Sequence, residues 1–141
     1  EDKSLIGDIR DTSNYEIFNK VNPELITIFR KIEKEFGKPL NIKWGYRDYK
    51  TNISAGGARH SSHLNGLALD IELEKPSRSI IKKLILICSN NGILGIGVYR
   101  DAQILHIDID QNKGKRAWGS NYHSTSIPFW AKKEIMYHLT K

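Results

Sequence analysis

The sequence contains a single cysteine and no long apolar run. One cysteine, Cys88, among 141 residues excludes an internal disulfide framework, and no cluster of Cys and His residues indicates a closed structural zinc site. No segment reaches the roughly 18 consecutive apolar residues of a membrane span. The first residues, EDKSLIGDIR, lack the basic and apolar regions of a signal peptide. We therefore expect a chain without a membrane span that is stabilised by packing.

Internal repeats, low-complexity segments and linkers are also missing, so we expect a single domain over residues 1–141. A chain of this length buries roughly 68–70% of its unfolded surface. The pairs Gly56-Gly57 and Gly95-x-Gly97 are not followed by the Lys-Ser or Lys-Thr of a phosphate loop, which argues against nucleotide binding. We interpret them as backbone devices for tight turns and close approach. Cys88, in the apolar run IIKKLILIC, is expected in the core.

The charge is unbalanced, with 22 Lys and Arg against 16 Asp and Glu and a net charge of +6. Such an excess fits an anionic partner, for example nucleic acid or an acidic cell wall. The basic residues are scattered along the sequence, however, and an ordinary solvated surface explains them equally well.

Three amphipathic helices and four short strands are indicated by the apolar pattern. Asn22-Pro23 supplies a cap and a first-turn proline for a helix that ends at Gly37. Two further helices are expected over residues 79–90 and 128–138, and strands over residues 40–46, 68–73, 96–100 and 104–109. We predict an α+β fold, with a small, mostly antiparallel sheet and helices packed on one face.

Two of these strands place polar side chains on one face. Side chains alternate along a strand, so Asp70 lies opposite Leu69 and Ile71, while His106 and Asp108 lie opposite Leu105 and Ile107. If helices cover the apolar faces, Asp70 and His106 align over a shared groove on the exposed side of the sheet. His63 precedes the turn signal Asn65-Gly66, so its imidazole can fold back toward Asp70. Two histidines and an aspartate are the ligand types of an open zinc site, although a half-exposed strand also explains LHIDID.

The flanking residues carry a more specific pattern. The stretch SSHLNGLALD at residues 61–70 satisfies S-x-H-x-x-G-x-A-x-D, and it resembles the zinc D-alanyl-D-alanine carboxypeptidase family, peptidase family M15. That family shares its fold with Hedgehog signalling domains and vancomycin-resistance dipeptidases. The resemblance extends upstream through GYRDYKTNISAGGARH and downstream through GIGVY and LHIDID, and covers about residues 42–118.

The resemblance implies a role for each matching residue. His63, Asp70 and His106 correspond to three zinc ligands, leaving a fourth position for water or substrate. Arg47 corresponds to a substrate-clamping arginine, whose planar fork suits a carboxylate or carbonyl. Ser61 corresponds to a serine that contacts substrate, while a local turn cap is the competing interpretation.

The catalytic acid departs from the family pattern. Better-known members carry an acidic residue three positions before the last histidine ligand, where this chain has Gln103. An amide cannot shuttle a proton, so another acid serves or the chain is catalytically impaired. Asp108 is our candidate for catalysis together with Arg47, because it follows His106 on the same strand face. Asp108 could equally orient a ligand histidine, and Asp101 and Glu72 are further candidates.

The resemblance thus implies a zinc-dependent peptidase that acts on peptidoglycan stem or cross-link peptides at a D-alanine-containing bond. The partners expected are peptides rather than nucleic acid, the chain is expected to be a monomer, and the cell wall, periplasm or exterior is the expected place of action. The alternative is a Hedgehog-like binding module, or a structural protein of a phage or similar particle, that keeps the metal site and hydrolyses slowly or not at all.

Overall fold

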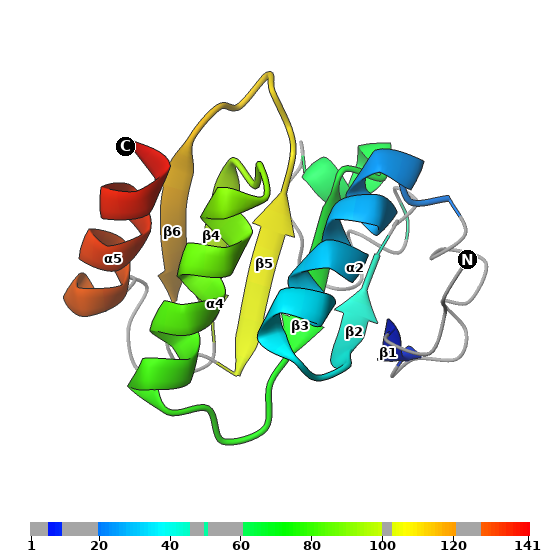
Figure 1. Cartoon of the computed structure of the whole chain (residues 1–141). Helices are drawn as coiled ribbons and strands as arrows, with labels where there is room; N and C mark the ends of the chain where they lie inside the picture. Colours follow the sequence, from blue (N-terminus) through cyan, green and yellow to red (C-terminus); the bar gives the residue numbers. More distant parts are fainter. Residues whose placement is uncertain (1–5, 10–19, 46–49, 51–60, 100–102, 121–127) are drawn as a thin grey trace.

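The computed structural model describes residues 6–9, 20–45, 50, 61–99, 103–120 and 128–141 (Figure 1). Its six strands are β1 (Ile6–Ile9), β2 (Leu40–Trp44), β3 (Ala68–Glu72), β4 (Gly95–Tyr99), β5 (Ile104–Asp108) and β6 (Arg116–Ser120). Its helices are α2 (Pro23–Phe36), α4 (Arg78–Asn90) and α5 (Phe129–Leu139), together with the 3-10 helix η2 (Ser62–Asn65). The three predicted helices and four predicted strands are confirmed within a residue or two, and β1, η2 and β6 were not predicted.

The strands form one sheet in the order β1-β2-β3-β5-β4-β6. Its central pairs, β2 with β3, β3 with β5 and β5 with β4, are antiparallel. The two outer pairs, β1 with β2 and β4 with β6, are parallel. The α+β prediction with a mostly antiparallel sheet is therefore confirmed.

Local sequence signals fix the ends of the helices. The Asn22 side chain accepts a hydrogen bond from the Glu24 amide at the start of α2, and Gly37 closes that helix in the left-handed conformation (φ 90°). The Ser77 side chain caps α4 by accepting from the Ile80 amide. One buried acid was not expected: the Glu33 carboxylate accepts from the Leu40 amide at 2.7 Å, which ties the end of α2 to the start of β2.

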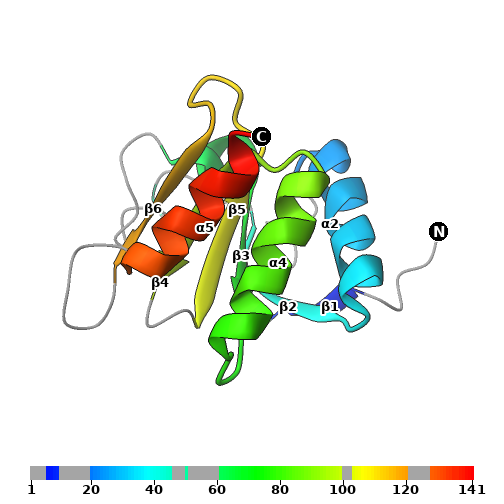
Figure 2. The same ribbon diagram turned by 60° about the vertical axis from the view of Figure 1, so that its left-hand side comes forward.

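Helices α2, α4 and α5 lie side by side over one face of the sheet, as the two views show (Figure 1, Figure 2). The core lies between these layers. Leu69, Ile71, Leu105 and Ile107 point into it and are fully buried, as the alternation predicted. Cys88 is buried in the same core, as expected. None of the helices in the described part of the chain is long and apolar enough to cross a membrane. The opposite face of the sheet is left for polar side chains.

Candidate metal centre

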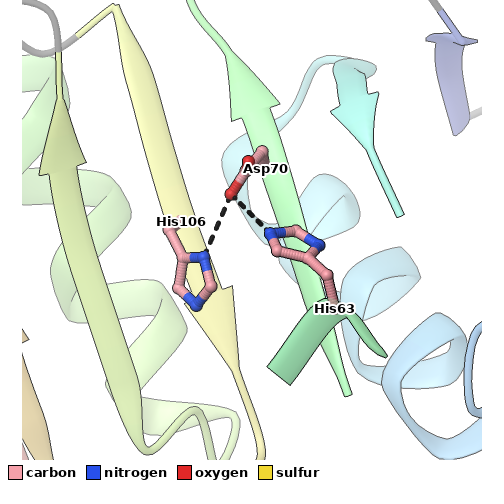
Figure 3. Close-up of side chains that lie close together, drawn as sticks. All are labelled: His63, Asp70 and His106. Atoms are coloured by element: carbon pink, nitrogen blue, oxygen red, sulfur yellow. Dashed lines mark hydrogen bonds and ion pairs between the residues drawn. The ribbon is translucent and has the colours of Figure 1, made fainter. Parts of the chain in front are cut away.

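Two histidines and an aspartate from three separate elements meet on the face of the sheet away from the helices (Figure 3). His63 comes from η2, Asp70 from the middle of β3, and His106 from the middle of β5. Asp70 and His106 are direct cross-strand partners. Potential ligand atoms of the three side chains all lie within 4.8 Å of one another. The sequence pattern therefore identified a real cluster.

His63 is placed by the turn that precedes β3. The Ser61 hydroxyl accepts a hydrogen bond from the His63 amide at 3.2 Å and caps η2. Gly66 ends η2 with φ 69°, and a Cβ there would lie 2.6 Å from the Lys20 carbonyl oxygen, so only glycine fits. The Ser62 hydroxyl donates to Asp110 Oδ2 at 2.8 Å, which ties the turn to the end of β5.

Hydrogen bonds orient both histidine rings. His63 Nδ1 lies 2.7 Å from the Gly45 carbonyl oxygen. A carbonyl can only accept, so Nδ1 carries the proton and Nε2 is free to bind a metal. His106 Nε2 lies 2.9 Å from Asp108 Oδ2, while His106 Nδ1 faces Asp70 Oδ1 at 3.1 Å. Since the carboxylate of Asp108 accepts from Nε2, Nδ1, on the side of Asp70 and His63, is the His106 nitrogen that could bind a metal.

Two of the three spacings between these atoms are close to those of a zinc site. His63 Nε2 and His106 Nδ1 lie 3.2 Å and 3.1 Å from the same oxygen, Asp70 Oδ1. Tetrahedral zinc with bonds of roughly 2.0–2.2 Å places its ligand atoms roughly 3.3–3.6 Å apart. Two imidazole nitrogens and one carboxylate oxygen are ligands that zinc accepts, and three protein ligands leave one position open.

The cluster also shifts the pKa values of its members. Burial alone would raise the pKa of Asp70, but the charge of His63 and hydrogen bonds from both histidines outweigh burial and hold the pKa far below its usual value. Burial alone would lower the pKa of His106, yet hydrogen bonds to Asp108 and Asp70 raise it. The metal-free cluster therefore favours an ionised aspartate beside a protonated His106.

Asp108 lies behind His106, on the far side of its ring from Asp70, and is fully buried. Arg116 Nη2 donates to both of its carboxylate oxygens, at 2.7 Å and 2.8 Å, and the Asp110 amide donates to Oδ1 at 3.1 Å. Burial would raise the pKa of Asp108, but the hydrogen bond and charge of His106, followed by Arg116 and the Asp110 amide, lower it. These contacts describe a carboxylate that holds an imidazole in place.

Two glycines allow β5 and β6 to touch across the strand between them. Strands that flank a common neighbour lie roughly 9.4–9.8 Å apart. On β4, Gly95 pairs with Asp108 and Arg116, and Gly97 pairs with His106 and Trp118. A Cβ at Gly95 would lie 2.5 Å from Asp108 Oδ2, and one at Gly97 would lie 2.9 Å from the Trp118 ring. Two contacts require the space above these glycines. One is the Asp108–Arg116 ion pair, and the other is the packing of Trp118 on His106, with ring centroids 4.8 Å apart.

The site is less exposed than the sequence suggested. We expected polar side chains on an exposed face, but His63, Asp70 and His106 are only 2%, 8% and 8% exposed. The alternating pattern of β5 could not reveal the contact of the His106 ring with Trp118, because Trp118 comes from the unpredicted strand β6. The sequence did contain one sign of the Arg116 contact. Gly95 and Gly97 lie on one face of a strand, and glycine within a strand often marks the close approach of other groups.

A comparison with protein-family models matches residues 6–108 to the family described as Peptidase M15. The chain belongs to the peptidase M15 family. The match contains His63, Asp70 and His106 and ends at Asp108, so Arg116 and Trp118 lie beyond it. No curated protein matches the chain at a significant level. Membership of an M15 peptidase family, together with a cluster of metal-binding type, indicates a metallopeptidase.

The remaining predicted site residues fall in different places. Arg47 and Asp101 lie outside the described residues, so the substrate-clamping role of Arg47 stays a prediction. Ser61 is seen as the cap of η2, and contact with substrate also stays a prediction. Gln103 precedes β5 in a turn, where its carbonyl accepts from the Leu73 amide. Glu72 lies two residues from Asp70 on the same strand face, partly exposed and 3.8 Å from Lys43 Nζ.

Proposed function

We propose that this chain is a zinc-dependent peptidase that hydrolyses peptidoglycan stem or cross-link peptides at a D-alanine-containing bond. The observation that carries the proposal is the meeting of His63 Nε2, Asp70 Oδ1 and His106 Nδ1, with each histidine held by a hydrogen bond from its other nitrogen. Zinc, when bound, activates water and polarises a peptide carbonyl. The cell wall, the periplasm or the cell exterior is the place of action that this substrate implies.

In this proposal the chain's own residues divide the work. His63, Asp70 and His106 hold the metal, and Asp108 fixes the His106 ring with the help of Arg116. Arg47 holds the substrate by bidentate hydrogen bonds. Asp108 is fully buried and accepts hydrogen bonds from His106, Arg116 and the Asp110 amide. We therefore propose that it orients His106 and does not transfer a proton to the substrate. Glu72 is the partly exposed acid on the same strand face as Asp70, and we assign it the proton transfer that Gln103 cannot perform.

A binding or structural module that keeps the metal site is the second candidate, and Gln103 is the observation that favours it. The two are separated by incubating the zinc-loaded chain with stem peptides that end in D-alanyl-D-alanine and with cross-linked dimers, followed by mass spectrometry of the products. A peptidase releases D-alanine or separates the dimer, and the His106→Ala variant does neither. Retained zinc without any product favours the binding module.

A further inference from the structure

The positive charge of the chain gathers on two neighbouring helices. Helices α4 and α5, with the terminal Lys141, carry six Lys or Arg residues and a single acid, Glu134, and thus +5 of the net charge of +6. The net positive charge is therefore concentrated on these two helices, because the other 16 basic residues are balanced by 15 acidic residues elsewhere in the chain. Such a concentration attracts anions along one side of the molecule.

An open groove runs between these two helices, which lie next to one another in both views (Figure 1, Figure 2). It has a volume of about 500 Å³ and is lined by Lys82 from α4 and by Trp130, Lys133, Glu134 and Tyr137 from α5. This volume lies within the roughly 300–1,000 Å³ of small-ligand sites. One acid, Glu134, shares the groove with the two lysines and contacts His138 Nε2 at 3.3 Å.

Aromatic rings in the groove lie close to cations. Trp130 and Tyr137 are seven residues apart, which places them two turns and roughly 10.5 Å apart along the same side of α5. The Arg78 guanidinium lies 4.7 Å from the centre of the Trp130 ring, and Lys141 Nζ lies 4.2 Å from that of Tyr137. Tyr137 is 54% exposed. A cation therefore lies over each ring, and Trp130 also packs against the core. Tyr137 is the exposed aromatic surface of the groove.

We propose that the groove between α4 and α5 binds an anionic glycan. The apolar face of a sugar ring packs on the exposed Tyr137 ring, and the carboxylate or phosphate groups of the glycan pair with Lys82 and Lys133. The choice of a glycan over other polyanions rests on the proposed action at the cell wall. Because the groove and the metal centre lie on opposite faces of the sheet, a bound polymer leaves the metal centre open.

The test uses the full chain and polygalacturonate as the probe, with binding measured by isothermal titration calorimetry. Lys82→Glu/Lys133→Glu should weaken binding by about tenfold or more, because two attractive charges become repulsive. The matched control is Lys31→Glu/Lys34→Glu on α2, which changes the net charge equally and should leave binding nearly unchanged. Tyr137→Ala should also weaken binding, and its exposed position makes it safe for folding.

Several outcomes would overturn the proposal. Equal weakening by both lysine pairs would show that net charge alone is responsible, and binding of neutral dextran with equal affinity would show that the cations take no part. Polyphosphate or single-stranded DNA binding as tightly as polygalacturonate would remove the role of sugar rings. Ile80 and Leu86 are also exposed on α4, so anionic phospholipid vesicles are included, and binding to vesicles alone would assign the surface to a membrane. None of these measurements requires metal or turnover, so the proposed peptidase activity can fail without affecting them.

Discussion

At the scale of single residues, the metal-free cluster holds a proton on His106 that a metal ion binding there would displace. Because the pKa of His106 is raised in the folded chain, protonation of His106 stabilises the fold. This stabilisation is fully present when the pH is below the ordinary histidine pKa of about 6.5, and it is lost as the pH rises through the raised pKa. Zinc binds the neutral imidazole, so its affinity grows over the same range. We expect the metal-free protein to lose stability as the pH rises above about 6.5, while the stabilisation by zinc increases. Thermal unfolding with and without zinc at several pH values measures both trends, and a metal-free protein that gains stability with pH would contradict them.

The roles of Asp108 and Glu72 are separated by a pair of isosteric changes. Asp108→Asn removes the acceptor that orients His106, and we expect zinc affinity to fall about 10–100-fold, with activity restored by excess zinc. Glu72→Gln should leave zinc affinity unchanged and lower kcat by about 10²–10⁴, the usual contribution of acid–base catalysis. Zinc titrations and kinetics at saturating zinc decide between them. If kcat instead collapses in Asp108→Asn at saturating zinc, Asp108 is the catalytic acid.

Ser61 also has two possible roles, as the cap of η2 or as a contact for the substrate. If its role is to cap η2, Ser61→Ala should destabilise the fold by about 0.5–2 kcal/mol and weaken zinc binding, because His63 follows directly on that turn. Ser61→Thr keeps the hydroxyl oxygen and serves as the control. An increase in KM for stem peptides, with unchanged stability and zinc affinity, would instead assign Ser61 to substrate contact.

At the scale of elements, the motif at residues 61–70 spans one turn, η2, and the start of one strand, β3. In S-x-H-x-x-G-x-A-x-D, Ser61 starts the turn, Gly66 ends it with a positive φ, and Ala68 is the small, buried cross-strand partner of Asp108. The two ligands of the motif, His63 and Asp70, depend on these three positions for their placement. A pattern that seems to list ligands therefore also encodes the backbone path between them.

The space above Gly95 on β4, which Asp108 and Arg116 occupy, leads to a further prediction. In Gly95→Ala the new methyl would collide with Asp108 and with Arg116, so we expect zinc affinity to fall together with the orientation of His106. Gly92→Ala is the matched control: no atom lies within 4 Å of its Cβ, but its φ of 85° is unfavourable for alanine. It should lose roughly 1–2 kcal/mol of stability and bind zinc normally. Equal zinc affinity in both variants would show that the Asp108–Arg116 pair does not support the metal site.

At the scale of the whole molecule, sequence reasoning found what is encoded locally. Caps at Asn22 and Gly37 and the alternation around Leu69 and Ile107 are local signals, and they located helices, strands and the core face. The residues that support the site are set by long-range pairing. Arg116 and Trp118 lie in RAWGS, a short stretch without clear alternation, and only the parallel pairing of β6 with β4 brings them to Asp108 and His106. Such pairings have no periodic signature, so they became visible only in the assembled sheet.

The position of β6 at the edge of the sheet has a consequence for opening of the fold. Among the strands that the structure describes, β6 has a single neighbour, β4, so its detachment removes Arg116 and Trp118 from the candidate metal centre but leaves His63, Asp70 and His106 together. An ion held by His106 should in turn oppose that detachment, because detachment releases the Asp108 carboxylate that fixes the ring. We therefore expect zinc to slow amide hydrogen exchange within residues 116–120, none of which binds the metal, while the α2 amides serve as the internal reference. Unchanged exchange in β6 would mean that the strand opens independently of the bound ion; slowed exchange would show that the ion stabilises this edge of the sheet against fraying.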